Sequence, residues 1–164
     1  MAYTLAGMLK EIQPSSDIVA IDKHRKNFPT FLLLKNYMVD YLLDDLEVDY
    51  AFECTGGEGS YYAIDDIIKY IATQRAVALI GVAENRILIC TRNIWEKGLT
   101  FVSGSRSNGV DFEKTIELMG KSHVQNRLST IINYEGVVSS ISDIYQMFRA
   151  DLTTSLKTIF KWEL

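Results

Sequence analysis

Cysteine is scarce in this chain of 164 residues: only Cys54 and Cys90 occur, each inside an apolar run. Neither belongs to a paired motif, so the sequence supports neither a disulfide framework nor a zinc knuckle. This usage favours a reducing compartment, and we expect a cytoplasmic protein. The two histidines, His24 and His123, also lack metal-ligand spacing to a cysteine or an acid.

The sequence also lacks an excess of basic residues and any long apolar run. Its formal net charge is −4, whereas a protein that binds nucleic acid needs a basic surface to displace counterions from phosphates. No apolar run approaches the roughly 20 residues that span a bilayer, and the N-terminus has no signal-peptide pattern. We therefore expect neither a nucleic-acid partner nor a membrane segment.

What the chain does contain is an alternation of strand-like and helix-like segments. With 48% hydrophobic and 23% charged residues, it is long enough to bury one sizeable core. We expect strands over 17–22, 38–43, 48–54, 76–82 and 99–105, and helices up to Pro14 and over 28–37, 61–73, 110–119 and 142–152. Such alternation predicts an α/β fold, a doubly wound, Rossmann-like and mostly parallel sheet joined by helical crossovers.

Small or polar residues follow four of the expected strands. Ligands of doubly wound sheets bind beyond the carboxyl ends of the strands, so these positions are candidate binding residues. The four strand ends carry Asp22, then Cys54-Thr55-Gly56-Gly57, then Gly81 and Val82, and then Ser103-Gly104-Ser105-Arg106. Their glycines allow close approach of a ligand to the backbone, and the alternative is ordinary turn chemistry.

Two further features have competing interpretations. An acid such as Asp22 can bind the adenosine ribose of NAD, whereas the basic residues 23–26 beside it could hold the extra phosphate of NADP or form a solvated turn. Cys54 is more often a packing residue than a nucleophile. The sequence shows no evident set of catalytic acids, bases, nucleophiles or metal ligands.

Taken in order, several segments resemble the C-terminal half of the zinc-type medium-chain alcohol dehydrogenases. They are DIVAIDKHRKN, VDYAFECTGGEGSYYAIDDIIKYI, AVALIGVAE, TRNIWEKGLTFVSGSRSNGVDFEKTIELM and SDIYQMFRADLTTSLKTIFKWEL. Within that family the chain is most similar to the ribulose-5-phosphate reductases, also called ribitol-5-phosphate dehydrogenases, which supply precursors of teichoic acid or capsule. The resemblance implies a Rossmann domain that binds NAD(P)H, beside a separate zinc-bearing catalytic domain.

The resemblance also implies roles for particular residues. Asp22 and Lys23 would face the adenosine ribose, and Gly81 and Val82 would face the nicotinamide. The remaining cofactor-binding candidates are Cys54, Thr55 and Gly56 at the middle of the cofactor and Ser105 and Arg106 at the last strand end. The reductases that use NADPH often lack an acid at the position of Asp22, so NADP and NAD both remain candidates.

The chain departs from the family at its front. The glycine-rich phosphate loop and the first, central strand of the family's sheet would precede Met1, and the zinc domain has no counterpart. We therefore expect residues 1–132 to form an incomplete NAD(P)-binding domain and residues 133–164 to be the segment that returns to the catalytic domain. Cofactor binding by this fragment should be weak or lost, and it should be inactive alone. The sheet, interrupted next to Val48, should close directly, exchange strands in a dimer or accept a partner's strand.

Two other classes of protein compete with an oxidoreductase fragment. The first is a non-catalytic oligomerisation or interaction domain, because in the resembling family the last strand, here about residues 99–103, pairs across a dimer axis. A homodimer is expected in either case. The second is a flavodoxin-like or response-regulator-like domain, which is disfavoured because the sheet starts with neither a phosphate loop nor an acidic pocket.

Overall fold

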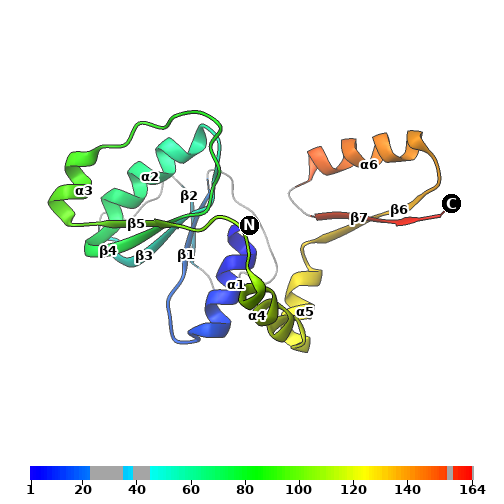
Figure 1. Cartoon of the computed structure of the whole chain (residues 1–164), viewed down its shortest axis with the longest axis horizontal. Helices are drawn as coiled ribbons and strands as arrows, with labels where there is room; N and C mark the ends of the chain where they lie inside the picture. Colours follow the sequence, from blue (N-terminus) through cyan, green and yellow to red (C-terminus); the bar gives the residue numbers. More distant parts are fainter. Residues whose placement is uncertain (23–34, 39–44, 155–156, 164) are drawn as a thin grey trace. The chain divides into compact units, whose positions relative to one another are not determined.

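A computed structural model describes residues 1–22, 35–38, 45–154 and 157–163 (Figure 1). The chain divides into two compact units, which are described separately. The first unit contains β3 (Val48–Glu53), α2 (Gly59–Tyr70), β4 (Ile71–Leu79), α3 (Thr91–Lys97) and β5 (Thr100–Ser103). The second contains most of α1 (Ala2–Ile12), and α4 (Gly109–Met119), α5 (Ser122–Ser129), β6 (Ile132–Val138), α6 (Ile141–Thr153) and β7 (Lys157–Trp162).

The first unit is built on a three-stranded parallel sheet in the order β3–β4–β5. Glu53 pairs with Leu79, and Leu79 pairs with Ser103, so the carboxyl ends of all three strands meet at one edge. Val77, in the central strand, is fully buried, as parallel strands usually are. Helix α2 connects β3 to β4 and buries Ile64 and Ile68. The predicted α/β class with parallel strands is confirmed.

The junction between α2 and β4 differs from the sequence-based expectation. The apolar pattern predicted a helix through Thr73 and a strand from Ala76, whereas the helix ends at Tyr70 and the strand begins at the next residue, Ile71. Ile71 is 1% exposed, so the first residue of the strand already belongs to the core. The polar residues 73–75 separate Ile71 from the apolar run that starts at Ala76, so the sequence pattern placed the start of the strand too late.

Lys97, from α3, stabilises this junction. Its Nζ donates hydrogen bonds to the carbonyl oxygens of Ile68, Lys69 and Ile71 at 2.7, 3.0 and 2.8 Å. The last carbonyls of a helix have no donor within the helix, and a cation there also complements the helix dipole. A side chain from α3, far along the sequence, therefore caps α2.

The strands β1 (Val19–Asp22) and β2 (Lys35–Met38) form a separate two-stranded sheet. No described strand joins this sheet to β3–β4–β5, so the interruption expected next to Val48 is present in the described part of the chain and direct closure of the gap is not found there. The expected helix over 28–37 is wrong at residues 35–37, which belong to β2; a short apolar run does not distinguish a helix from a strand. Its other residues, and those of the expected strand 38–43 beyond Met38, lie outside the described residues.

In the second unit, β6, α6 and β7 form a compact crossover. The two strands pair in parallel, and α6 connects them and contacts both. Ser140 caps the helix: its Oγ accepts from the backbone N–H of Asp143, and Asp143 Oδ2 accepts from the backbone N–H of Ser140. This capping box confirms the helix expected over 142–152. None of the helices in the described ranges is long and apolar enough to cross a bilayer.

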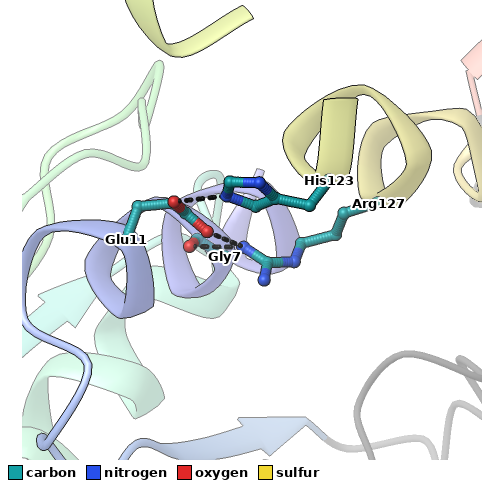
Figure 2. Close-up of polar contacts among 4 residues, drawn as sticks. All are labelled: Gly7, Glu11, His123 and Arg127. Atoms are coloured by element: carbon teal, nitrogen blue, oxygen red, sulfur yellow. Dashed lines mark hydrogen bonds and ion pairs between the residues drawn. The ribbon is translucent and has the colours of Figure 1, made fainter. Parts of the chain in front are cut away.

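Helices α1 and α5 of the second unit are joined by polar contacts around Glu11 (Figure 2). His123 Nε2 lies 2.7 Å from Glu11 Oε2, and Arg127 Nη1 lies 3.4 Å from Glu11 Oε1 and donates to the carbonyl of Gly7 at 2.8 Å. The hydrogen bond to His123 is the largest of the effects that lower the pKa of Glu11, with the charges of His123 and Arg127 adding to it. Partial burial acts in the opposite direction.

Acid should therefore weaken the contact between α1 and α5. A lowered pKa means that Glu11 stabilises the fold fully above its ordinary value of 4.5, and that this contribution is lost as the pH falls through the lowered value. We expect Glu11→Gln to be less stable than the unmodified chain at neutral pH and to converge with it in acid. Thermal unfolding in a pH series measures this, with exposed Glu113→Gln of α4 as the control. A constant difference at every pH would contradict the expectation.

Candidate functional site

The loops that follow β3 and β4 lock together at the carboxyl edge of the parallel sheet. The N–H of Gly57 donates to the carbonyl of Val82 at 2.9 Å. A Cβ on Gly56 would stand 2.9 Å from the same carbonyl oxygen, and a Cβ on Gly81 would stand 2.5 Å from the nitrogen of Gly56. The structure thus brings together the predicted residues Gly56, Gly81 and Val82, which come from different strand ends.

This packing requires a glycine at both positions. It supports the turn-chemistry interpretation of the two glycines, and close approach of a ligand there stays a prediction. Gly56 has a φ of +70°, which side-chain-bearing residues rarely adopt. Gly81 has no room for a side chain in any conformation close to the observed one. Tight loop geometry is therefore established for both residues. Val82 is 80% exposed, so the joined loops still present backbone and side chain at the surface.

Glu53, the last residue of β3, lies beneath these loops and was not among the predicted site residues. Its side chain is 2% exposed. Oε1 accepts hydrogen bonds from the backbone N–H groups of Thr55 and Gly56 at 2.7 and 3.1 Å, and from Ser60 Oγ at 3.1 Å. The signal that could have revealed it is an acid that ends an apolar strand immediately before a glycine-containing turn.

The main chain of Glu53 contacts the second loop. Its carbonyl oxygen accepts from the N–H groups of Ile80 and Gly81, both at 2.9 Å. The carboxylate also lies against this loop, since a Cβ on Gly81 would stand 2.4 Å from Oε2. One residue therefore contacts both loops of the candidate site.

Cys54 is half-buried beside Glu53 and is not disulfide-bonded. Burial, and after it the charge of Glu53, raises the pKa of the Cys54 thiol. A thiol with a raised pKa carries less of the reactive thiolate at neutral pH. The environment therefore favours the packing role over the nucleophilic one.

The structure places three more of the predicted residues at the ends of other strands. Ser105 and Arg106 follow β5 and are exposed, at the edge of the sheet where β3 and β4 also end. Arg106 has a φ of +69°, an uncommon conformation for a residue with a side chain. Asp22 is the exposed last residue of β1, and Lys23 lies outside the described residues.

The described parts of the chain contain no set of side chains that could bind a zinc ion. No group of three or more histidine, cysteine, aspartate or glutamate side chains is placed to hold a metal ion there. A catalytic zinc site takes three such protein ligands and leaves a fourth position open. The described residues therefore do not fit a zinc ion.

Comparison with known sequences gives consistent relatives. No protein-family model matches the chain. It is 39% identical over its full length to a ribulose-5-phosphate reductase of Streptococcus pneumoniae and 34% identical to ribulose-5-phosphate reductase 2 of Staphylococcus aureus. It covers 48% and 49% of these proteins, so the chain spans about half the length of the curated relatives it matches.

Solved structures agree with the sequence relatives. Crystal structures of S. aureus TarJ, one of them in complex with NADPH, match 99% of the chain with a TM-score of 0.92 at 33% identity, over 53% and 52% of the TarJ chain. The 2R,3R-butanediol dehydrogenase of Bacillus subtilis matches 96% of the chain, and 47% of its own, with a TM-score of 0.73 at 15% identity. At that identity the match shows the fold alone. The resemblance read from the sequence is confirmed: over its whole length the chain is similar to about half of a ribulose-5-phosphate reductase, with the α/β fold found in TarJ and the alcohol dehydrogenases.

Proposed function

We propose that this chain binds a nicotinamide dinucleotide at the carboxyl ends of β3, β4 and β5, as part of a cytoplasmic protein that reduces ribulose 5-phosphate to ribitol 5-phosphate. The observation that carries the proposal is the pair of interlocked, glycine-lined loops at Gly56 and Gly81. Its position beyond the ends of parallel strands is where doubly wound folds bind nucleotides. NADPH is the favoured cofactor, because a TarJ structure 33% identical to the chain is a complex with NADPH.

Different residues would contact different parts of such a cofactor. Thr55 and Gly56 would face its middle, and Gly81 and Val82 its nicotinamide ring, which supplies the hydride when bound. Thr55 and Val82 are both exposed, so neither is withdrawn into the core. Ser105, Arg106 and Cys54 remain predicted contacts at the same edge, and Asp22 and Lys23 remain predicted contacts of the adenosine ribose.

Titration of the 15N-labelled chain with NADPH and with NADH tests the proposal. We expect the amide signals of Gly56, Gly81 and Val82 to shift in a saturable manner, at lower concentrations of NADPH than of NADH. Amides of the second unit, such as those of Ser140 and Asp143, provide the internal control. We expect the binding to be weak but measurable, because the domain is incomplete. Binding weaker than millimolar for both cofactors would contradict the proposal and favour an oligomerisation or interaction domain.

The chain alone should not turn over substrate. Reduction of a ketose by this class of enzyme requires polarisation of the carbonyl by zinc, and the described residues offer no ligand set for the ion. Incubation with NADPH and ribulose 5-phosphate should therefore leave NADPH unoxidised. Oxidation at a rate proportional to the concentration of the chain would overturn this part of the proposal.

Residues 133–164 are proposed to contact the catalytic part of the full-length protein. The outward side of α6 supports this, because Ile141, Tyr145, Phe148 and Leu152 are each between 66% and 86% exposed. Their spacing of four, three and four residues places them along one face of the helix. Such a continuous apolar stripe is typical of a surface that is covered in the complete protein.

The edge strand β5 favours a homodimer. It also favours the second candidate function, that of an oligomerisation domain. This strand is at the edge of the β3–β4–β5 sheet in the described structure, and Val102 within it is 48% exposed. An exposed apolar edge strand can pair with its copy in another chain. We expect Val102→Lys to shift the chain toward the monomer in sedimentation, with Val110→Lys of α4 as the control. A monomeric unmodified chain would contradict the dimer.

A further inference from the structure

Glu53 is the one buried charged side chain among the described residues. Removal of a carboxylate from water is costly unless hydrogen bonds or a cation offset the loss. No described cation forms an ion pair with Glu53. Its compensation comes from three donors on Oε1, namely the N–H groups of Thr55 and Gly56 and the hydroxyl of Ser60. The fold therefore retains a costly group at the point where the two candidate loops meet.

The contacts of Glu53 divide between those loops. Its side chain holds the backbone of Thr55 and Gly56, and its own carbonyl holds Ile80 and Gly81. The carboxylate also fills the space beside Gly81, so both loops pack against the same group. A shift of this side chain would move both loops relative to each other.

We infer that Glu53 is a positioning residue of the dinucleotide site. Its carboxylate fixes the backbone of Thr55 and Gly56 against that of Gly81 and Val82, so that both loops present their surfaces to one ligand at once. The inference rests on the proposed function, because the ligand is the nicotinamide dinucleotide. Glu53 acts through the loops and does not itself touch the cofactor. Such preorganisation strengthens binding, because the entropy lost in ordering the two loops is lost during folding and not on binding.

Two conservative variants distinguish the effect of the position of the Glu53 carboxylate from the effect of its charge. Glu53→Asp keeps the charge but withdraws the carboxylate by one methylene, whereas Glu53→Gln keeps the length and an oxygen that can accept the same hydrogen bonds. We expect Glu53→Asp to bind NADPH at least about tenfold more weakly than the unmodified chain, and Glu53→Gln to remain within about threefold. Exposed Glu58→Gln, in the adjacent turn, is the matched control and should change the Kd by less than about twofold.

The measurements are the Kd from titration with NADPH, and amide hydrogen exchange at Thr55 and Gly56 in each variant. Faster exchange in Glu53→Asp, together with weaker binding, supports the inference. Unchanged exchange with an unchanged Kd in both variants would overturn it, as would a loss of binding in Glu53→Gln that Glu53→Asp does not share.

The exchange data also separate this inference from the proposed function. If the unmodified chain binds neither NADPH nor NADH, the proposed function fails, and with it the dinucleotide role of Glu53. Exchange at Thr55 and Gly56 then still decides whether the carboxylate fixes the loops. If instead the unmodified chain binds and only the variants behave unexpectedly, the proposed function stands and the role of Glu53 is wrong.

Discussion

Gly81→Ala should lower the free energy of unfolding by about 3 kcal/mol and remove measurable NADPH binding, because the added methyl group has no space. Its Cβ would lie 2.4 Å from Glu53 Oε2, 2.8 Å from Oε1 and 2.5 Å from the nitrogen of Gly56. One of these neighbours is backbone, and the others belong to a buried carboxylate that is itself hydrogen-bonded. The methyl group can be accommodated only if the two loops separate.

Chemical denaturation and titration with NADPH measure the two effects. Gly104→Ala is the matched control: it follows β5 as Gly81 follows β4, but no atom lies within 4 Å of its added Cβ. We expect the control to change stability by no more than about 0.5 kcal/mol. Equal stability of the two variants would show that the loops are not packed as described.

Lys97→Met should destabilise the chain by about 2 kcal/mol. The substitution keeps an unbranched apolar side chain but removes the ammonium group that donates to the carbonyls of Ile68, Lys69 and Ile71. Hydrogen bonds from a charged group contribute more than neutral ones, and part-buried carbonyls left without a donor add a desolvation cost. The favourable interaction with the C-terminal end of α2 is lost at the same time.

The measurement is again chemical denaturation, supported by amide exchange around Ile71. Lys114→Met, on the exposed surface of α4, makes the same chemical change without this set of acceptors, and its stability should stay close to that of the unmodified chain. If Lys97→Met were as stable as Lys114→Met, the cap would contribute nothing and the sharp turn at Ile71 would need another cause.

The sequence predicted the parts of the fold that have clear local signals. The apolar alternation around β3 and β5, and the helical spacing of α4 and α6, are properties of short segments, and these elements appear where they were expected. The helix expected over 28–37 failed at residues 35–37, because the short apolar run that precedes them in the sequence suits a helix or a strand equally. A local pattern identifies an element only where its hydrophobic period fits a helix and not a strand, or a strand and not a helix.

The candidate site was predicted in its residue types and strand positions but not in its internal contacts. Gly56 and Gly81 were candidates because they follow strands, and parallel pairing brings them together. Glu53 was missed, because an acid at a strand end gives no sign of whether it is buried. Its burial depends on the other loop, which is distant in sequence.

By itself, the sequence determined the α/β class, the order of most elements and the resemblance to the ribulose-5-phosphate reductases, since these depend on residue types and spacings along the chain. The tertiary structure alone decided that Glu53 is buried between two loops and that Lys97 ends α2. Both facts depend on contacts between residues more than 25 positions apart. Such contacts form only when the parallel strands are paired, and no local pattern encodes them.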